Sequence, residues 1–187
     1  MKRIKDFIYN NIQGKKVLFF FVVTNLVYVF MLFVTIPKVM SYSNGMKIPD
    51  LMPTGYNTDH INTLFTILGT EGRNVYLYNQ IPADMVYPLL FAICYSLLLA
   101  YLFKKLNILQ GVFLNLCLLP VIAGVSDYIE NFGIIAMLNS FPNISDWLVN
   151  LTNVFTIIKS MNTTIYFVVL IITLVALGLK RIKDNGK

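Results

Sequence analysis

The apolar residues of this chain fall into four long blocks separated by shorter polar stretches. The blocks cover residues 17–37, 83–103, 108–138 and about 163–179. An apolar helix of about 17–25 residues is long enough to cross the hydrocarbon core of a bilayer. The pattern therefore predicts an all-α fold, a four-transmembrane-helix bundle that the whole chain, 1–187, forms as a single membrane domain.

Two of the connections between the blocks carry amphipathic stripes. In the long connection 38–82, a helix is expected to begin at Thr58, and Ile61, Leu64, Phe65 and Leu68 recur at helical spacing. A second amphipathic helix is expected after Ser145, with Trp147, Leu148, Leu151, Val154, Phe155 and Ile158 on one face and Asp146, Asn150, Asn153 and Lys159 on the opposite face. The block 108–138 is also longer than a span requires, unless a break intervenes. We therefore expect an extracytoplasmic helical cap whose stripes bury one another; the alternative is that the stripes lie flat in the membrane interface.

Composition and charge place the chain in a membrane. Hydrophobic residues make up 57% and charged residues 13% of the sequence, whereas soluble domains carry about 25% charged residues. Of the 15 Lys and Arg residues, all but Lys38, Lys47, Arg73 and Lys159 lie at the block ends that face the two termini. The positive-inside rule then places both termini in the cytoplasm. We expect an integral protein of a bacterial plasma membrane, with the lipid bilayer as its main partner and no nucleic-acid partner.

A layer of polar side chains is predicted near the outer ends of the second and third blocks. Asp127, Glu130 and Asn131 share one helical face because they are spaced i, i+3, i+4. Asp84 begins a stripe on the second block, which Arg73, Tyr76 and Gln80 extend outward if the preceding segment is helical. The expected cluster consists of Arg73, Tyr76, Asp84, Asp127, Glu130 and Asn131.

Two interpretations of this layer remain open. In the structural one, Arg73 pairs with the carboxylates and Asn131 joins two helices. In the functional one, three carboxylates face one arginine, and the missing positive charge is supplied by a protonated carboxyl, a bound cation or a cationic ligand.

The sequence contains no motif that points to a catalytic centre, a metal site or a cofactor. It has a single histidine, and Cys94 and Cys117 lie inside apolar runs without a C-x-x-C pattern. We expect both cysteines to be packing residues. No residue is assigned a catalytic role, and no metal or cofactor is expected.

Three short patterns carry a resemblance. Gly72-Arg73-x-x-Tyr76, Asp84-x-x-x-Pro88 and Asp127-x-x-Glu130-Asn131 look like those of a class of small, uncharacterised four-helix integral membrane proteins. This resemblance covers most of the chain after residue 57 and implies no activity. At the level of topology alone, the chain is also similar to sterol-isomerase-like four-helix proteins, which hold acidic residues in a membrane pocket for a cationic amphiphile.

The leading hypothesis is a non-enzymatic membrane protein with an outward-facing polar pocket that binds a cation or a lipid-like ligand, such as a cationic or amphipathic small molecule. One alternative is an intramembrane acid/base enzyme that uses Asp127 or Glu130. The other is an accessory or immunity-type subunit that contacts another membrane protein.

Overall fold

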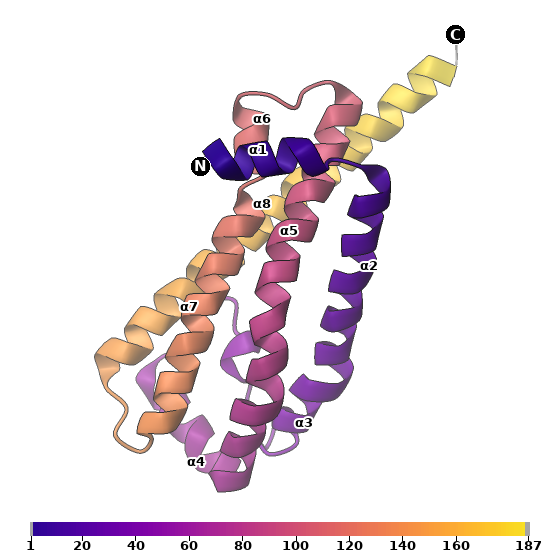
Figure 1. The fold of residues 1–187 in the computed structure, drawn as a ribbon. Coiled ribbons are helices and arrows are strands. Elements are labelled where there is room, and N and C mark those ends of the chain that lie inside the picture. Colours follow the sequence, from indigo (N-terminus) through magenta and orange to yellow (C-terminus); the bar gives the residue numbers. More distant parts are fainter. Residues whose placement is uncertain (1, 186–187) are drawn as a thin grey trace.

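The computed structural model describes residues 2–185, with side chains from Asp6 to Asp184, and this part of the chain forms a helical bundle (Figure 1). Four helical stretches are long and apolar enough to cross a membrane: Gly14–Met40, Thr58–Leu106, Val112–Ser140 and Asp146–Asp184. The predicted all-α bundle of four long apolar helices is confirmed. Both ends of the chain lie at the top in Figure 1, and α3, α4 and the α7–α8 connection lie at the bottom.

The N-terminal part of the chain forms a helix that lies across the bundle, the transverse helix, followed by the first long helix. Helix α1 (Lys2–Asn11) lies across the top of the bundle in Figure 1, and α2 (Gly14–Phe30) runs downward from it. The π-helical turn η1 (Met31–Thr35) joins α2 to α3 (Ile36–Met40). Ile8 of the transverse helix and Ile12, just after it, are buried in a core cluster that includes Phe103 of α5.

The segment after α3 packs over the opposite end of the bundle. It contains the 3₁₀ turn η2 (Pro49–Leu51) and α4 (Thr58–Val75), which is capped by Asn57. All four residues of the predicted stripe (Ile61, Leu64, Phe65 and Leu68) are buried, in one cluster with Ile134 and Met137 of α7. The helix expected at Thr58 is therefore present, and its apolar stripe is buried in the same cluster as residues of the third long helix.

A glycine divides α4 into two parts. Gly69 has φ 61 and ψ −174, which breaks the helical conformation inside α4 and suits a residue without a Cβ. The chain then continues through a second π-helical turn, η3 (Tyr76–Gln80), into α5 (Ile81–Leu106). Much of the predicted connection 38–82 is thus helical and continuous with the second long helix.

The predicted block 108–138 is not one helix. Helix α5 ends at Asn107, which has φ 62, and the short α6 (Val112–Leu116) precedes α7 (Leu119–Ser140). Pro120 lies in the first turn of α7, where a missing N–H is tolerated. A break near the top of the bundle therefore takes up part of the excess length of this block.

The fourth long helix is longer than predicted. Instead of an amphipathic helix after Ser145 and a separate span from 163, α8 runs without interruption from Asp146 to Asn185. Near the junction of these two segments, Asn162 and Thr164 donate side-chain hydrogen bonds to the backbone carbonyls four residues earlier, both at 2.8 Å, so these polar groups are satisfied within the helix.

Small residues set the spacing of the central helices. A Cβ on Gly124 of α7 would lie 2.7 Å from the backbone oxygen of Pro88 in α5, and a Cβ on Gly133 would lie 2.1 Å from Oγ1 of Thr152 in α8. Helix α7 therefore approaches both neighbours closely. By contrast, α2 packs mostly on α5, and α8 packs mostly on α7. One face of α5 therefore lies open between α2 and α8.

Candidate functional site

A cavity of about 370 Å³ occupies this face of α5. Its walls come from α2, η1, α5, α7 and α8, and its lower end is covered by the segment around η2. The lining residues are Asn25, Tyr28, Met31, Leu32, Ile36, Asp50, Leu51, Pro53, Asp84, Tyr87, Phe91, Tyr95, Ala123, Asp127, Lys159, Ser160, Thr163, Thr164 and Phe167. Along α5 the lining runs from Asp84 through Tyr87 and Phe91 to Tyr95, so the ionisable groups lie at the η2 end of the cavity, its polar end, and aromatic side chains follow along its length.

Lys159 of α8 is the cation of the polar end. Its Nζ donates to Oδ1 of Asp127 at 3.1 Å and forms an ion pair with Oε2 of Glu130. The Lys159 side chain is 20% exposed, whereas Glu130 is 1% exposed. Oε1 of Glu130 has no hydrogen-bond partner among the described atoms. One ammonium group thus holds two carboxylates of α7, which is the geometry expected of a buried ion pair.

Asp50 and Asp84 form a second acidic pair, in neither of the ion pairs within the described part of the chain. Asp50 accepts hydrogen bonds from the Tyr76 hydroxyl and from Nε2 of Gln80, the latter at 3.0 Å. The Asp84 side chain lines the same cavity and is 5% exposed. Neither carboxyl group forms an ion pair with a Lys or Arg among the described residues, so these two groups lack a full positive counter-charge.

The two π-helical turns support the acidic pair. Oε1 of Gln80, in η3, accepts a hydrogen bond from the hydroxyl of Thr35, in η1. The Gln80 amide can then only donate its Nε2 toward Asp50. Tyr76, Gln80 and Thr35 are all buried. The π turns, which often mark functional sites, thus place the donors that orient Asp50.

Five of the six predicted cluster residues lie at this site. Asp127, Glu130, Asp84 and Tyr76 make the contacts described above, and Nδ2 of Asn131 donates to the backbone oxygen of Asp84 at 3.1 Å. This last bond joins α7 to α5, as the structural interpretation of Asn131 expected.

Arg73 is the exception, and its expected pairing with the carboxylates is wrong. Its guanidinium donates to the backbone oxygen of Phe65 at 2.7 Å and lies 4.5 Å from the centre of the Phe141 ring. The break at Gly69 separates Phe65 from Arg73 and interrupts the helix between them. The arginine therefore connects the two parts of α4 across the kink, and Lys159 provides the positive charge of the acidic layer.

Sequence reasoning missed two central residues. Lys159 was placed on the outer polar face of a separate helix, but the uninterrupted α8 turns it toward α7. Asp50 lies in a turn-rich segment that has no periodicity from which a direction can be inferred. For Lys159, a signal did exist: no glycine or proline occurs between Asp146 and Gly178, so a continuous helix was the simpler prediction.

Aromatic rings form the other end of the cavity. Tyr28 of α2 stacks on Tyr87 of α5 with centroids 5.4 Å apart and planes inclined by 26°. Phe91 and Tyr95 follow along α5 with a centroid distance of 4.7 Å. Rings present negative faces that attract cations as well as apolar chains. The cavity is therefore acidic at one end and aromatic along its length.

The segment that covers the acidic end is fastened to α8. The Tyr56 backbone N–H donates to Oδ1 of Asn153 at 2.9 Å, and the Thr156 hydroxyl donates to the Tyr56 phenol oxygen at 3.3 Å. Burial raises the pKa of Tyr56 above its usual value, so the phenol stays neutral. Gly55 has φ 95, and a Cβ there would lie 2.3 Å from Oδ1 of Asn153. The close fit shows why glycine precedes Tyr56.

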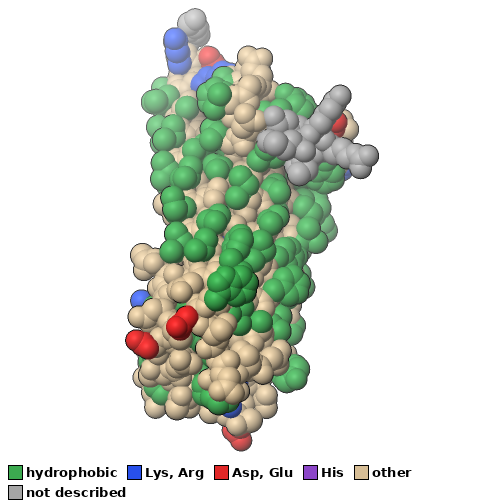
Figure 2. Space-filling view, turned by 90° about the vertical axis from the view of Figure 1, so that its left-hand side faces the viewer, with side chains coloured by type: hydrophobic (Ala, Val, Ile, Leu, Met, Phe, Trp, Pro, Cys, Tyr) green, Lys and Arg blue, Asp and Glu red, His purple; other side chains and the backbone are tan. Residues whose placement is uncertain are grey.

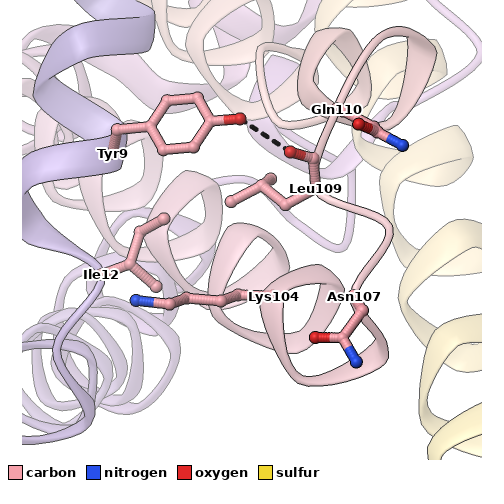
Figure 3. A pocket seen from close by; sticks show the side chains of 6 residues that line it. All are labelled: Tyr9, Ile12, Lys104, Asn107, Leu109 and Gln110. Carbon is pink, nitrogen blue, oxygen red and sulfur yellow. Dashed lines mark hydrogen bonds between the residues drawn. The ribbon is translucent and has the colours of Figure 1, made fainter.

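A second cavity, of about 280 Å³, lies at the other end of the bundle (Figure 3). The Tyr9 hydroxyl donates to the Leu109 carbonyl across it at 2.7 Å, and the Lys104 side chain extends along Ile12. This cavity has a basic lining residue and no acidic one. The charge of its lining is therefore the opposite of that of the acidic cavity. The Tyr9–Leu109 hydrogen bond links α1 to the α5–α6 connection.

No known protein family, curated protein or solved structure matches this chain. Within residues 2–185, no three His, Cys, Asp or Glu side chains converge in a way that would hold a metal ion. The assignment of function therefore rests on the chemistry of the acidic cavity.

Proposed function

We propose that the chain is an integral protein of a bacterial plasma membrane, with both termini in the cytoplasm and the η2–α4 segment on the outer side. Figure 2 supports this arrangement, because apolar side chains cover much of the height of the visible face. Lys180 Nζ donates to the Lys105 carbonyl at 3.2 Å, so two basic helix ends meet beside α1. Basic groups concentrated at one end of an apolar bundle favour a cytoplasmic position for that end.

Cysteine labelling tests this topology. Lys47 and Lys183 are exposed at opposite ends of the bundle, and the native Cys94 and Cys117 are buried. We expect Lys47→Cys to react with a membrane-impermeant maleimide on intact cells, and Lys183→Cys to react only after permeabilisation. Reaction of Lys183→Cys in intact cells would contradict the proposed orientation.

We infer further that the acidic cavity binds an amphipathic cation, as the leading sequence hypothesis holds. The observation that carries this inference is the imbalance of charge: Asp50, Asp84 and Asp127 line the cavity and Glu130 lies beside it, whereas Lys159 is the one lining residue with a positive charge, and it pairs with Asp127 and Glu130. Unpaired carboxylates are costly away from water. A ligand cation at the Asp50–Asp84 pair supplies the missing charge, and the aromatic wall accommodates its apolar part.

The same geometry favours an organic cation over a metal ion. The carboxyl groups of Asp127 and Glu130 are engaged by Lys159, and Asp50 is oriented by two donors. This arrangement leaves Asp84 as the group with the fewest fixed partners at the polar end of the cavity. For the enzymatic alternative, Asp127 lines the cavity but Glu130 does not. Fixed ion pairing of both groups supports binding over proton transfer.

A binding experiment with ligands that differ only in charge tests the proposal. Purified protein is titrated with dodecylamine, dodecanol and dodecanoate, and the affinity is measured calorimetrically. We expect dodecylamine to bind about tenfold or more tightly than the other two, and Asp84→Asn to remove about tenfold of that affinity, because one charge-assisted contact is lost. Asp59→Asn is the matched control, since Asp59 is an exposed residue of α4 outside the cavity. Equal affinities for dodecylamine and dodecanol, or equal effects of the two variants, would overturn the proposal.

A further inference from the structure

We propose that the ligand of the acidic cavity is a single-chain amine dissolved in the bilayer, which reaches the Asp50–Asp84 pair sideways through a mouth between α2 and α8. This inference rests on the proposed function and specifies both the class of ligand and its route. The mouth is defined here by Tyr28 of α2 and by Thr164 and Phe167 of α8, which all line the cavity.

The side chains that form the mouth are exposed on the outside of the bundle. Tyr28 is 41% exposed and Phe167 is 38% exposed, and Thr164 is also exposed. Deeper lining residues are covered, with Asp84 at 5% and Phe91 at 6% exposure. Since α2 packs mostly on α5 and α8 packs mostly on α7, the cavity opens between α2 and α8.

The mouth lies on the apolar flank of the bundle. Tyr28 is 14 residues beyond the start of α2 at Gly14, which is about 21 Å along the helix axis at 1.5 Å per residue. The exposed neighbours of the mouth along the two helices are apolar: Leu26, Val29, Phe30, Phe33, Ile165, Val168, Ile171 and Ile172. In a bilayer these side chains contact lipid tails, so the mouth opens into hydrocarbon.

The acidic end of the cavity is covered from the outer side. Asp50, Leu51 and Pro53 form that cover. The segment is held at Asp50 by Tyr76 and Gln80, and at Tyr56 by Asn153 and Thr156. Both attachments would have to open for a ligand to enter from the aqueous outer side, whereas the mouth is already open.

The shape of the cavity selects a single chain. From Asp84 to Tyr95 the lining residues of α5 span 11 residues, or about 16 Å along the axis. A volume of about 370 Å³ equals that of roughly a dozen water molecules at about 30 Å³ each. This is enough for an ammonium head and part of one alkyl chain, and too little for a two-chain phospholipid. The head lies at Asp84, and the chain passes Tyr87 and Phe91 to leave through the mouth.

Photoaffinity labelling tests this arrangement. The probe is dodecylamine that carries a diazirine at the end of its chain, added to the full-length protein in nanodiscs and activated by light. We expect labelling that excess dodecylamine displaces to fall on residues 25–32 of α2 and 163–168 of α8. Thr164→Phe narrows the mouth and should reduce the displaceable labelling about tenfold. Met161→Phe, an exposed α8 residue outside the lining, should leave it unchanged.

The outcomes separate this inference from the proposed function. If displaceable labelling falls on residues 48–53, or if Thr164→Phe behaves as Met161→Phe does, the lateral route is wrong. Calorimetric binding that still depends on Asp84 would then leave the proposed function standing. If butylamine binds as tightly as dodecylamine, the alkyl chain does not occupy the cavity and the assignment of an amphiphile is wrong. If the affinity for amines is the same in the wild type and in Asp84→Asn, both proposals are wrong.

Discussion

Lys159→Met should destabilise the protein by about 3–5 kcal/mol, because removing one partner of a buried ion pair leaves the remaining charge uncompensated. The remaining charges are those of Asp127 and Glu130, and Glu130 is 1% exposed. Methionine keeps most of the length and volume of lysine, so that loss of charge dominates over loss of packing. The measurement is the free energy of unfolding of the purified protein, by denaturant titration in mild detergent.

Two further variants make this prediction specific. Lys38→Met changes an exposed lysine in α3 and should alter stability by about 0.5 kcal/mol or less. The double variant Lys159→Met with Glu130→Gln removes the better buried of the two carboxylates, and should recover a large part of the loss. The assignment of the ion pair would be wrong if Lys159→Met were as stable as Lys38→Met. It would also be wrong if the double variant were less stable than Lys159→Met alone.

Gly124→Ala should destabilise the bundle by about 1–3 kcal/mol, as overpacked sites generally do. The added Cβ would lie 2.7 Å from the Pro88 backbone oxygen and 3.3 Å from Cβ of Ala92. A backbone oxygen cannot rotate away, so α5 and α7 must separate. Asn131 bridges the same two helices through the Asp84 carbonyl, and the affinity for dodecylamine should fall together with stability.

Gly178→Ala provides the matched control for this substitution. Gly178 lies in α8, and a Cβ there would meet nothing within 4 Å. Alanine is preferred over glycine inside a helix by about 0.5–1 kcal/mol, so this variant should equal or exceed the wild type in stability. The two Gly→Ala changes should therefore shift the unfolding free energy in opposite directions. Shifts of the same sign would show that close contact between α5 and α7 does not limit the packing.

Periodicity along single helices was the most informative part of the sequence. It identified the four apolar blocks, the buried stripe of α4, and the shared face of Asp127, Glu130 and Asn131. These features depend only on residues within a few turns of one another. Asp84 was expected in the same cluster, and Asn131 of α7 donates to its backbone oxygen.

The errors have a common physical origin in helix continuity. Arg73 was expected to extend the stripe of Asp84, but the π turn at Tyr76–Gln80 changes the helical register between them. The positive φ of Gly69 breaks α4 upstream of Arg73, whose guanidinium donates to the Phe65 carbonyl instead. Lys159 was assigned to the polar face of an amphipathic external helix, whereas α8 is continuous and brings it to Asp127 and Glu130. Asp50 approaches the site through a long-range contact with Tyr76 and Gln80, and no local pattern encodes such a contact.

The transverse helix α1 has a consequence for the order in which the protein is made. Tyr9 bonds to Leu109, 100 residues later in the chain, and Ile8 packs in the cluster that contains Phe103 and Cys117. At about 5–20 residues per second, a ribosome needs roughly 5–20 s to add that stretch. Helix α1 therefore leaves the ribosome before its docking site does, and it settles only after α5 has been synthesised and the chain has turned into α6. Its contacts close this end of the bundle as a late step of assembly.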